Sequence, residues 1–213
     1  GSGFKIAMRD LSIRGAGNLL GAQQHGFIDS VGFDLYSQML KDAIEQRRGI
    51  KKEDLISIEI DIEVDAYLPD TYIQDSKQKI EMYKQFRRIE TFEELNDLQD
   101  ELMDRFGDFP VEVGYLCQVA HIKLLANAEK IELIKQVKSE VSVYFSEQAS
   151  TNIDGAKLFQ LCNSFGRGIG LGMEGSKLKI TLDVKGKNPA EWLTTLEGLI
   201  NGLKNVKKES VNA

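Results

Sequence analysis

The chain has 213 residues, 42% of them hydrophobic and 28% charged, and its 27 Lys and Arg against 33 Asp and Glu give a net charge of −6. A chain of this size can bury a substantial core. It has no apolar run of about 18 residues that could span a bilayer and no signal-peptide pattern, so we expect a cytoplasmic protein without a membrane partner. The acidic balance is not that of an autonomous nucleic-acid-binding protein.

The first notable segment is glycine-rich and covers residues 9–27. Gly15, Gly17 and Gly21 have nearly the spacing of the dinucleotide-binding fingerprint, in which glycines let the backbone approach a pyrophosphate. That fingerprint needs a helix directly after the glycines, whereas here a second turn follows and the next helix is predicted only from Val31. The sequence also has no Walker A motif, so the pattern disfavours a self-contained nucleotide-binding enzyme.

A helix and then a strand are predicted after this segment. Apolar residues recur at helical spacing over residues 31–48, and Gly49 follows a basic last turn. A long alternation of apolar and polar residues then predicts a strand, with its apolar positions at Ile56, Ile58, Ile60, Ile62 and Val64. We place a domain boundary just before this strand, which divides the chain into residues 1–50 and 51–213.

Two helices are predicted next. Thr91 and Glu94 have the spacing of a capping box, and Gly107 and Pro110 mark the end of that helix. Its expected buried stripe is Leu95, Leu98, Leu102 and Phe106. The apolar face expected for the second helix is Val113, Leu116, Cys117, Ala120 and Leu124.

Strand patterns return from Ile131 and end in one more helix. The alternating segments are 131–139, 141–147 and 169–184, and the last contains a predicted hairpin turn at Gly175. A short helix is predicted over 155–165. A final helix is expected from the N-cap Asn188, with Pro189 at its first position. The second unit is therefore predicted to be an α+β domain of mixed helices and a small sheet.

Candidate metal ligands are few. Cys117 and His121 lie one helical turn apart, but a metal site needs three or four ligands, and the other cysteine and histidine, Cys162 and His25, are distant in the sequence. We expect no metal site. Both cysteines are predicted to pack as small apolar side chains, and His25 is interpreted as a loop residue rather than a general base.

An acidic stripe offers a different function. At about 100° per residue, one flank of the helix that follows Thr91 carries Glu94, Asp97, Glu101 and Asp104, joined by Arg105. Such a flank is usually a solvated surface. It would also suit a basic partner surface through complementary potential.

A resemblance to a known family adds to this interpretation. The sequence RDLSIRGAGNLLGAQQHGFIDSVGFDLYSQML, residues 9–40, resembles the translocation motif of the transcription-repair coupling factor family. It is similar, less closely, to the R-G-x-G-x-L-L-G-x-x-Q-x-G segment of RecG-type branch-migration motors. The segments IEIDIEVDAYLPDTYI and ELMDRFGDFP and the helix that runs into HIKLLANAEKI also resemble the coupling factors.

This resemblance implies a parent protein that is an ATP-dependent translocase on double-stranded DNA, acts on stalled RNA polymerase and recruits nucleotide excision repair. Residues 1–50 would be the tail of its second RecA-like motor lobe, where Arg14, Gln24 and Arg9 of the translocation motif couple nucleotide state to DNA movement. The forked guanidinium of arginine suits that role because it holds phosphate or carboxylate bidentately. ATP and Mg²⁺ would be bound by the parent; the sequence of this chain has no ATPase motif, catalytic residue or cofactor site of its own.

Residues 51–213 would be the family's C-terminal regulatory domain. In that family, the domain binds the protein's own N-terminal UvrB-like module and masks its UvrA-binding surface. The contact maps onto Glu101, Asp104 and Arg105, which coincide with the acidic stripe. A fragment of a RecG-like motor acting on branched DNA remains the alternative.

Overall fold

The structure is a computed structural model and describes residues 58–209. The predicted domain boundary near residue 50, the predicted helix over 31–48 and the residues Arg9, Arg14 and Gln24 lie outside the described residues. The helices are α4 (Ser76–Arg88), α5 (Phe92–Phe106), α6 (Val111–Ala128), α7 (Glu147–Thr151), α8 (Gly155–Ser164) and α9 (Pro189–Gly202), followed by a 3₁₀ turn (Leu203–Asn205). The strands are β1 (Glu59–Asp61), β2 (Ile131–Val137), β3 (Glu140–Phe145), β4 (Ile169–Glu174) and β5 (Lys177–Asp183).

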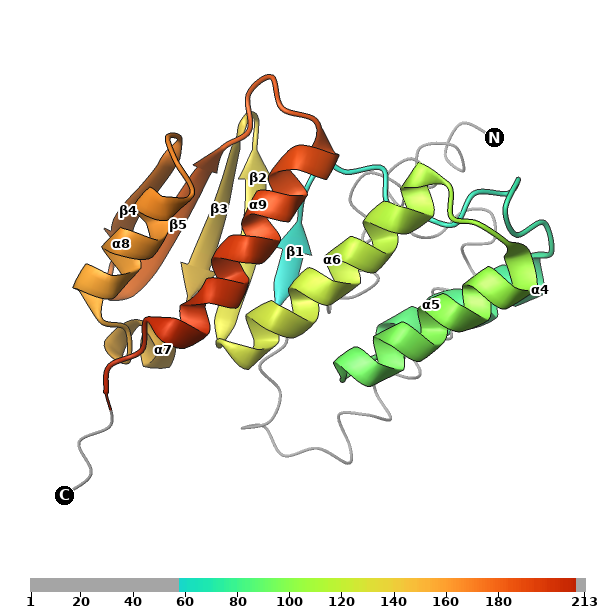
Figure 1. Cartoon of the computed structure of the whole chain (residues 1–213), viewed down its shortest axis with the longest axis horizontal. Helices are drawn as coiled ribbons and strands as arrows, with labels where there is room; N and C mark the ends of the chain where they lie inside the picture. Colours follow the sequence, from blue (N-terminus) through green and yellow to red (C-terminus); the bar gives the residue numbers. More distant parts are fainter. Residues whose placement is uncertain (1–57, 210–213) are drawn as a thin grey trace.

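The strands form one mixed sheet with the order β1-β2-β3-β5-β4 (Figure 1). β1 is parallel to β2, and all the other neighbours are antiparallel. One row across the sheet aligns buried residues of four strands, namely Ile60, Ile134, Val143 and Ile180. The α+β class predicted from the sequence is confirmed.

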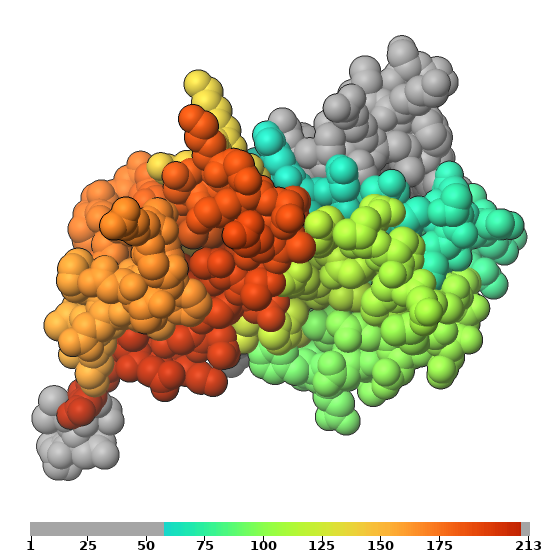
Figure 2. Space-filling model, turned by 45° about the horizontal axis from the view of Figure 1, so that its top comes forward, coloured from blue at the N-terminus to red at the C-terminus, as the bar shows by residue number. Residues whose placement is uncertain are grey.

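The helices cover this sheet from one side and extend beyond it. In Figure 1, α8 and α9 lie in front of the strands, α6 runs beside α9 at the β1 edge of the sheet, and α4 and α5 lie on the far side of α6. A single cluster of buried side chains runs from Ile58 to Val206. Figure 2 accordingly shows the green helical end and the orange and red sheet-containing end in direct contact. Within residues 58–209, no helix has the length and apolar character needed to cross a membrane.

The strand predicted from the alternation up to Val64 is much shorter than expected. Burial does alternate from Ile58 to Leu68, but only Glu59–Asp61 pairs with β2. Beyond β1, other groups satisfy the backbone: the Glu63 N–H donates to Gln136 Oε1 (2.8 Å) and the Leu68 N–H to Tyr83 Oη (2.8 Å). The alternation therefore reports a segment buried on one side, not a ladder of strand hydrogen bonds.

Two helices were not predicted. The first, α4, buries Lys79, Met82, Tyr83 and Phe86. Its N-cap Asp75 accepts a hydrogen bond from the Lys77 N–H at 2.8 Å, and its last turn is basic. The second, α7, spans only five residues and begins at the N-cap Ser146. The helices predicted near residues 91–106, 113–124, 155–165 and 189–203, the three later strand segments and the hairpin turn at Gly175, with φ 63°, are confirmed.

Candidate protein interface

The acidic stripe lies on α5, and its helix begins with the predicted cap. Thr91 Oγ1 accepts a hydrogen bond from the Glu94 N–H at 3.1 Å and donates one to Glu94 Oε1 at 3.0 Å. This satisfies one of the otherwise unpaired N–H groups of the first turn. Leu95, Leu98 and Leu102 are buried as predicted, so the opposite and flanking faces of α5 are turned outward.

The other end of α5 is fixed by a residue that the sequence did not reveal. The hydroxyl of Tyr72, in the loop before α4, lies within hydrogen-bond distance of both Leu102 O (3.1 Å) and Gly107 O (2.8 Å) and shares its one proton between them. Its ring also lies 5.8 Å from that of Phe106 and 6.4 Å from that of Phe109, centroid to centroid. Burial, more than the nearby charges, raises the pKa of Tyr72 above 10.0. Tyr72 therefore holds the turn of α5 that carries the three predicted interface residues.

Those three residues form one edge of the helix. Asp104 and Arg105 are exposed, and the Arg105 Nη1 lies 3.9 Å from Glu101 Oε2, which is an ion pair too long for a hydrogen bond. The Arg105 guanidinium also lies 5.0 Å above the Phe106 ring centroid. Glu101 Oε2 is itself buried and receives no hydrogen bond from any group in residues 58–209. The Glu101 side chain as a whole is 39% exposed, so a donor from a partner can reach this carboxylate and form a charge-assisted hydrogen bond.

A hollow of about 280 Å³ lies beside this edge. Its walls come from the end of α4 and from the acidic flank of α5, and the residues lining it are Gln85, Arg88, Ile89, Glu94, Asp97, Leu98 and Glu101. Three carboxylates face one guanidinium there. The structure thus brings together Glu94, Asp97 and Glu101, as helical periodicity predicted, whereas Asp104 is not among the lining residues.

The α4 wall of the hollow is the part that sequence reasoning missed. Arg88 and Gln85 contribute to it, and both belong to the unpredicted helix. A signal was present, because Asp75 precedes apolar residues with helical spacing between positions 80 and 86, and two arginines end the pattern. Arg9, Arg14 and Gln24 lie outside residues 58–209, so the structure does not place them.

The cysteines and His121 have structural surroundings. Cys117 and Cys162 are buried, and burial raises the pKa of the Cys117 thiol to about 12 and that of Cys162 to about 11. His121 Nδ1 lies 3.3 Å from Glu197 Oε1, and its ring makes an edge contact with Phe92. Across residues 58–209, no three His, Cys, Asp or Glu side chains are grouped so that they could hold a metal ion. Thiols with pKa values this high are poor nucleophiles at neutral pH.

Comparisons with known proteins agree on one family. The TRCF domain model matches residues 62–156. The transcription-repair-coupling factor of Bacillus subtilis is 63% identical over the whole chain, and that of Staphylococcus epidermidis is 50% identical over 94% of it. The chain covers only 18% and 17% of the length of these two relatives.

A solved structure gives the same answer for the fold. The crystal structure of a C-terminal domain of transcription-repair coupling factor superposes with a TM-score of 0.65 at 28% sequence identity. The match covers 70% of this chain and 93% of that one. The chain therefore belongs to the transcription-repair coupling factor family, and it has the fold of a C-terminal domain of that factor.

Proposed function

We propose that this chain is the C-terminal part of an ATP-dependent DNA translocase that removes stalled RNA polymerase and recruits nucleotide excision repair. Its segment 1–50 contributes the translocation motif, with Arg14, Gln24 and Arg9 coupling the nucleotide state to movement on double-stranded DNA. ATP and Mg²⁺ are bound by other parts of the parent protein. The names of the relatives and the family match support this proposal.

Within this protein, residues 51–213 act as an autoinhibitory interaction domain. The acidic edge of α5 binds a basic surface on the N-terminal UvrB-like module and covers the surface that UvrA recognises. The observation that carries this assignment is the Glu101 side chain: it is 39% exposed, its Oε2 makes a long ion pair with Arg105 at 3.9 Å, and no group of residues 58–209 donates a hydrogen bond to that oxygen. An arginine from the partner would donate a charge-assisted hydrogen bond to the Glu101 carboxylate.

Rigidity supports the same assignment. The cap at Thr91 and the shared hydrogen bond of Tyr72 fix both ends of α5 before any partner arrives. A surface that is already ordered loses little entropy on binding. The exposed acids Asp97 and Asp104 on the same edge would raise the association rate with a basic partner.

The test is calorimetric titration of this chain with the purified N-terminal UvrB-like module of the same protein. Charge reversal by Glu101→Lys with Asp104→Lys is expected to weaken binding at least about tenfold, because it removes two carboxylates from this edge and places positive charges against a basic surface. The matched control is Glu140→Lys with Glu209→Lys, which makes the same change in net charge at two exposed sites remote from α5. This control is expected to bind the UvrB-like module with the same affinity as the unsubstituted chain.

Three outcomes would contradict the assignment. Binding that survives reversal at α5 would place the interface elsewhere. Equal weakening by both double variants would mean that net charge, not this edge, drives association. Binding to branched DNA without binding to the module would favour the RecG-like alternative. Circular dichroism of each variant shows whether the fold is retained.

A further inference from the structure

The outer edge of β4 is an unpaired strand edge. β4 is the last strand of the sheet, and its only neighbour within residues 58–209 is β5 (Figure 1). The Asp183 N–H donates to Gly168 O at 2.8 Å, and the ladder continues with Gly170 opposite Thr181 and Gly172 opposite Lys179. In an antiparallel ladder, every second residue bonds to its neighbour. The intervening residues, Ile169, Leu171 and Met173, therefore turn their N–H and C=O groups to the free edge.

The same three residues carry the apolar side chains of β4. They lie on the helix-covered face of the sheet, because they pair with Leu182, Ile180 and Leu178, which are buried or half-buried. Yet Leu171 is 38% and Met173 58% exposed. The strand contains no proline or lysine of the kind that blocks pairing at natural sheet edges. Both its backbone and its side chains are thus prepared for another strand.

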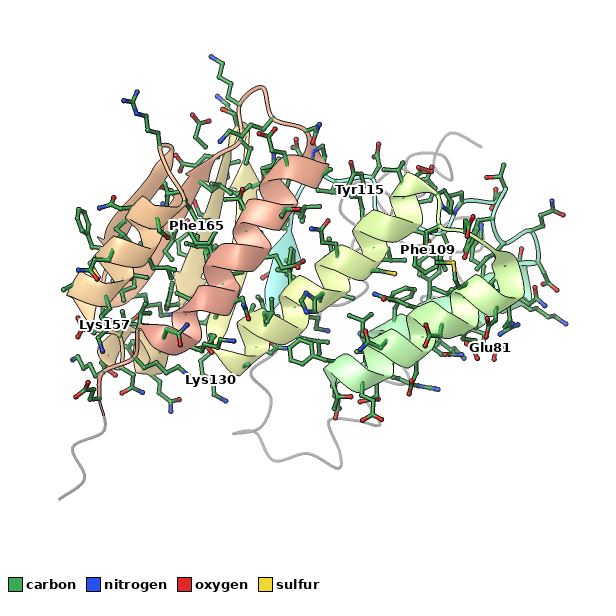
Figure 3. The ribbon with its side chains drawn as sticks, in the orientation of Figure 1. Glu81, Phe109, Tyr115, Lys130, Lys157 and Phe165 are labelled. Atoms are coloured by element: carbon green, nitrogen blue, oxygen red, sulfur yellow. The ribbon has the colours of Figure 1, made fainter. Side chains whose placement is uncertain are left out.

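Helix α8 extends this apolar surface. Leu158 and Cys162 face the core, and Leu161 faces α9, because a side chain on Gly202 would contact it. Phe165 lies on the α9 side as well, against Gly198 (Figure 3). Phe159, two residues before Leu161, points about 160° away from it around the helix. It therefore lies on the β4 side, where it is 59% exposed.

We propose that the edge of β4 docks a second copy of β4, which joins two five-stranded sheets into one continuous sheet. The strand is self-complementary. Ile169, Leu171 and Met173 are evenly spaced, so a two-fold axis through Leu171 places Leu171 opposite its own copy and Ile169 opposite Met173 of the other copy. In this antiparallel register all three residues turn bonding groups toward the partner strand, and their side chains gather on one face beside both copies of Phe159.

The glycines of β4 fit the same arrangement. Gly170 and Gly172 alternate with the apolar residues and would lie opposite each other on the second face of the joined sheet. At Gly170 a side chain is excluded by β5 itself, because a Cβ atom would lie 2.6 Å from Thr181 Oγ1. At Gly172 no atom lies within 4 Å of such a Cβ, so the glycine there leaves the edge flat and accessible.

The expected dimer is weak. One pair of short strands with three apolar side chains from each copy buries less than the roughly 1,600 Å² typical of stable complexes. We expect a dissociation constant on the order of 10–100 µM. The inference concerns only the β4 edge and does not depend on the function proposed for α5.

Sedimentation velocity of the whole chain over a concentration series tests the proposal. The unsubstituted chain is expected to shift from monomer to dimer as its concentration passes the dissociation constant. Leu171→Lys, which places a charge at the centre of the edge, should remain monomeric at concentrations at least about tenfold higher. The matched control is Val111→Lys, since Val111 is 60% exposed on α6, far from β4 in sequence; it should dimerise like the unsubstituted chain.

A second measurement identifies the strand directly. A synthetic peptide with the sequence of residues 167–175 should compete with dimerisation. Hydrogen exchange at the N–H groups of Ile169, Leu171 and Met173 should slow as the concentration rises. A chain that stays monomeric to about 1 mM, or a dimer that Leu171→Lys does not affect, would overturn the proposal. If Leu171→Lys lost the native circular dichroism spectrum, the peptide and exchange results would decide.

Discussion

At the scale of single residues, the hydroxyl of Tyr72 connects the loop before α4 to the end of α5. It shares its proton between two carbonyls, Leu102 O and Gly107 O, in the last turn of the helix and just after it. Tyr72→Phe keeps the ring contacts but removes this shared hydrogen bond. We expect the free energy of unfolding to fall by about 1 kcal/mol, the usual net value of such bonds. Urea denaturation followed by circular dichroism measures the change.

The matched control for this variant is Tyr115→Phe. Tyr115 is also half-buried, and no hydrogen bond of its hydroxyl is found among residues 58–209. The control should therefore change stability by a few tenths of a kcal/mol at most. If Asp104 and Arg105 form the interface, Tyr72→Phe should also weaken binding to the UvrB-like module, because the turn that carries them is then less firmly held. Equal stability of the two variants would argue against the anchoring role of Tyr72.

Lys123 on α6 predicts a pH dependence. Its pKa is lowered from 10.5 to about 8, mainly by burial and also by the neighbouring Arg87, while Glu90 acts in the opposite direction. Between pH 8 and 10.5 the unfolded chain still holds a proton that the folded chain has released. The contribution of Lys123 to folding is therefore most unfavourable below pH 8 and improves as the pH rises through this window.

Lys123→Met removes this cost while keeping most of the apolar stem. The variant should be more stable than the unsubstituted chain at pH 7, by an amount on the order of 2 kcal/mol, and this advantage should shrink toward pH 10. Denaturation of both proteins between pH 7 and 10 measures the difference between their free energies of unfolding. Cysteines and tyrosines also titrate in this range, but they are common to both proteins, so their effect cancels in the difference. Lys130→Met, which removes an exposed ammonium, controls for the loss of one charge. A constant difference across the range would contradict the prediction.

At the scale of elements, the cap of α5 is the feature that the sequence predicted best. The Glu94 N–H donates to Thr91 Oγ1 as expected of an N-cap, because capping is decided within four residues; the Glu94 carboxylate accepts from the Thr91 hydroxyl rather than from the Thr91 N–H of a full capping box. Thr91→Ala should cost about 1 kcal/mol, whereas Thr91→Ser, which keeps the hydroxyl, should cost only a few tenths. Thermal or urea unfolding of both variants separates them. An equal loss would show that the methyl group of Thr91, and not its hydroxyl, stabilises the helix start.

Elements whose form depends on distant residues could not be predicted in this way. The segment after β1 keeps the burial pattern of a strand, but its N–H groups bond to Gln136 and Tyr83, which are 73 and 15 residues away. The acidic flank of α5 followed from periodicity alone. The hollow beside it did not, because part of its wall is the end of α4, and the buried state of Glu101 Oε2 depends on the packing around it.

At the scale of the whole molecule, residues 58–209 have the organisation of an independent domain. One core connects the sheet, α9, α6 and the α4–α5 pair, so no boundary between two cores divides this part of the chain. The end of the domain is tied to its middle: the Asp154 N–H donates to Val206 O at 2.8 Å, and the Lys208 N–H to Asn152 O at 2.7 Å. Such a body is expected to unfold in a single cooperative transition.

The predicted boundary near residue 50 can be tested by shortening the chain to residues 51–213. This keeps every core residue found within residues 58–209, so the shortened chain should fold alone, unfold cooperatively and melt within about 5 °C of the 213-residue chain, a shift equivalent to roughly 1–2 kcal/mol. A second chain that starts at residue 63 is the matched comparison. It removes β1 with the buried Ile58 and Ile60, leaves the edge of β2 unpaired and should lose cooperativity. If the 51–213 chain failed to fold while the 213-residue chain folds, residues 1–50 would belong to the same cooperative unit, and the division of the chain at residue 50 would be wrong.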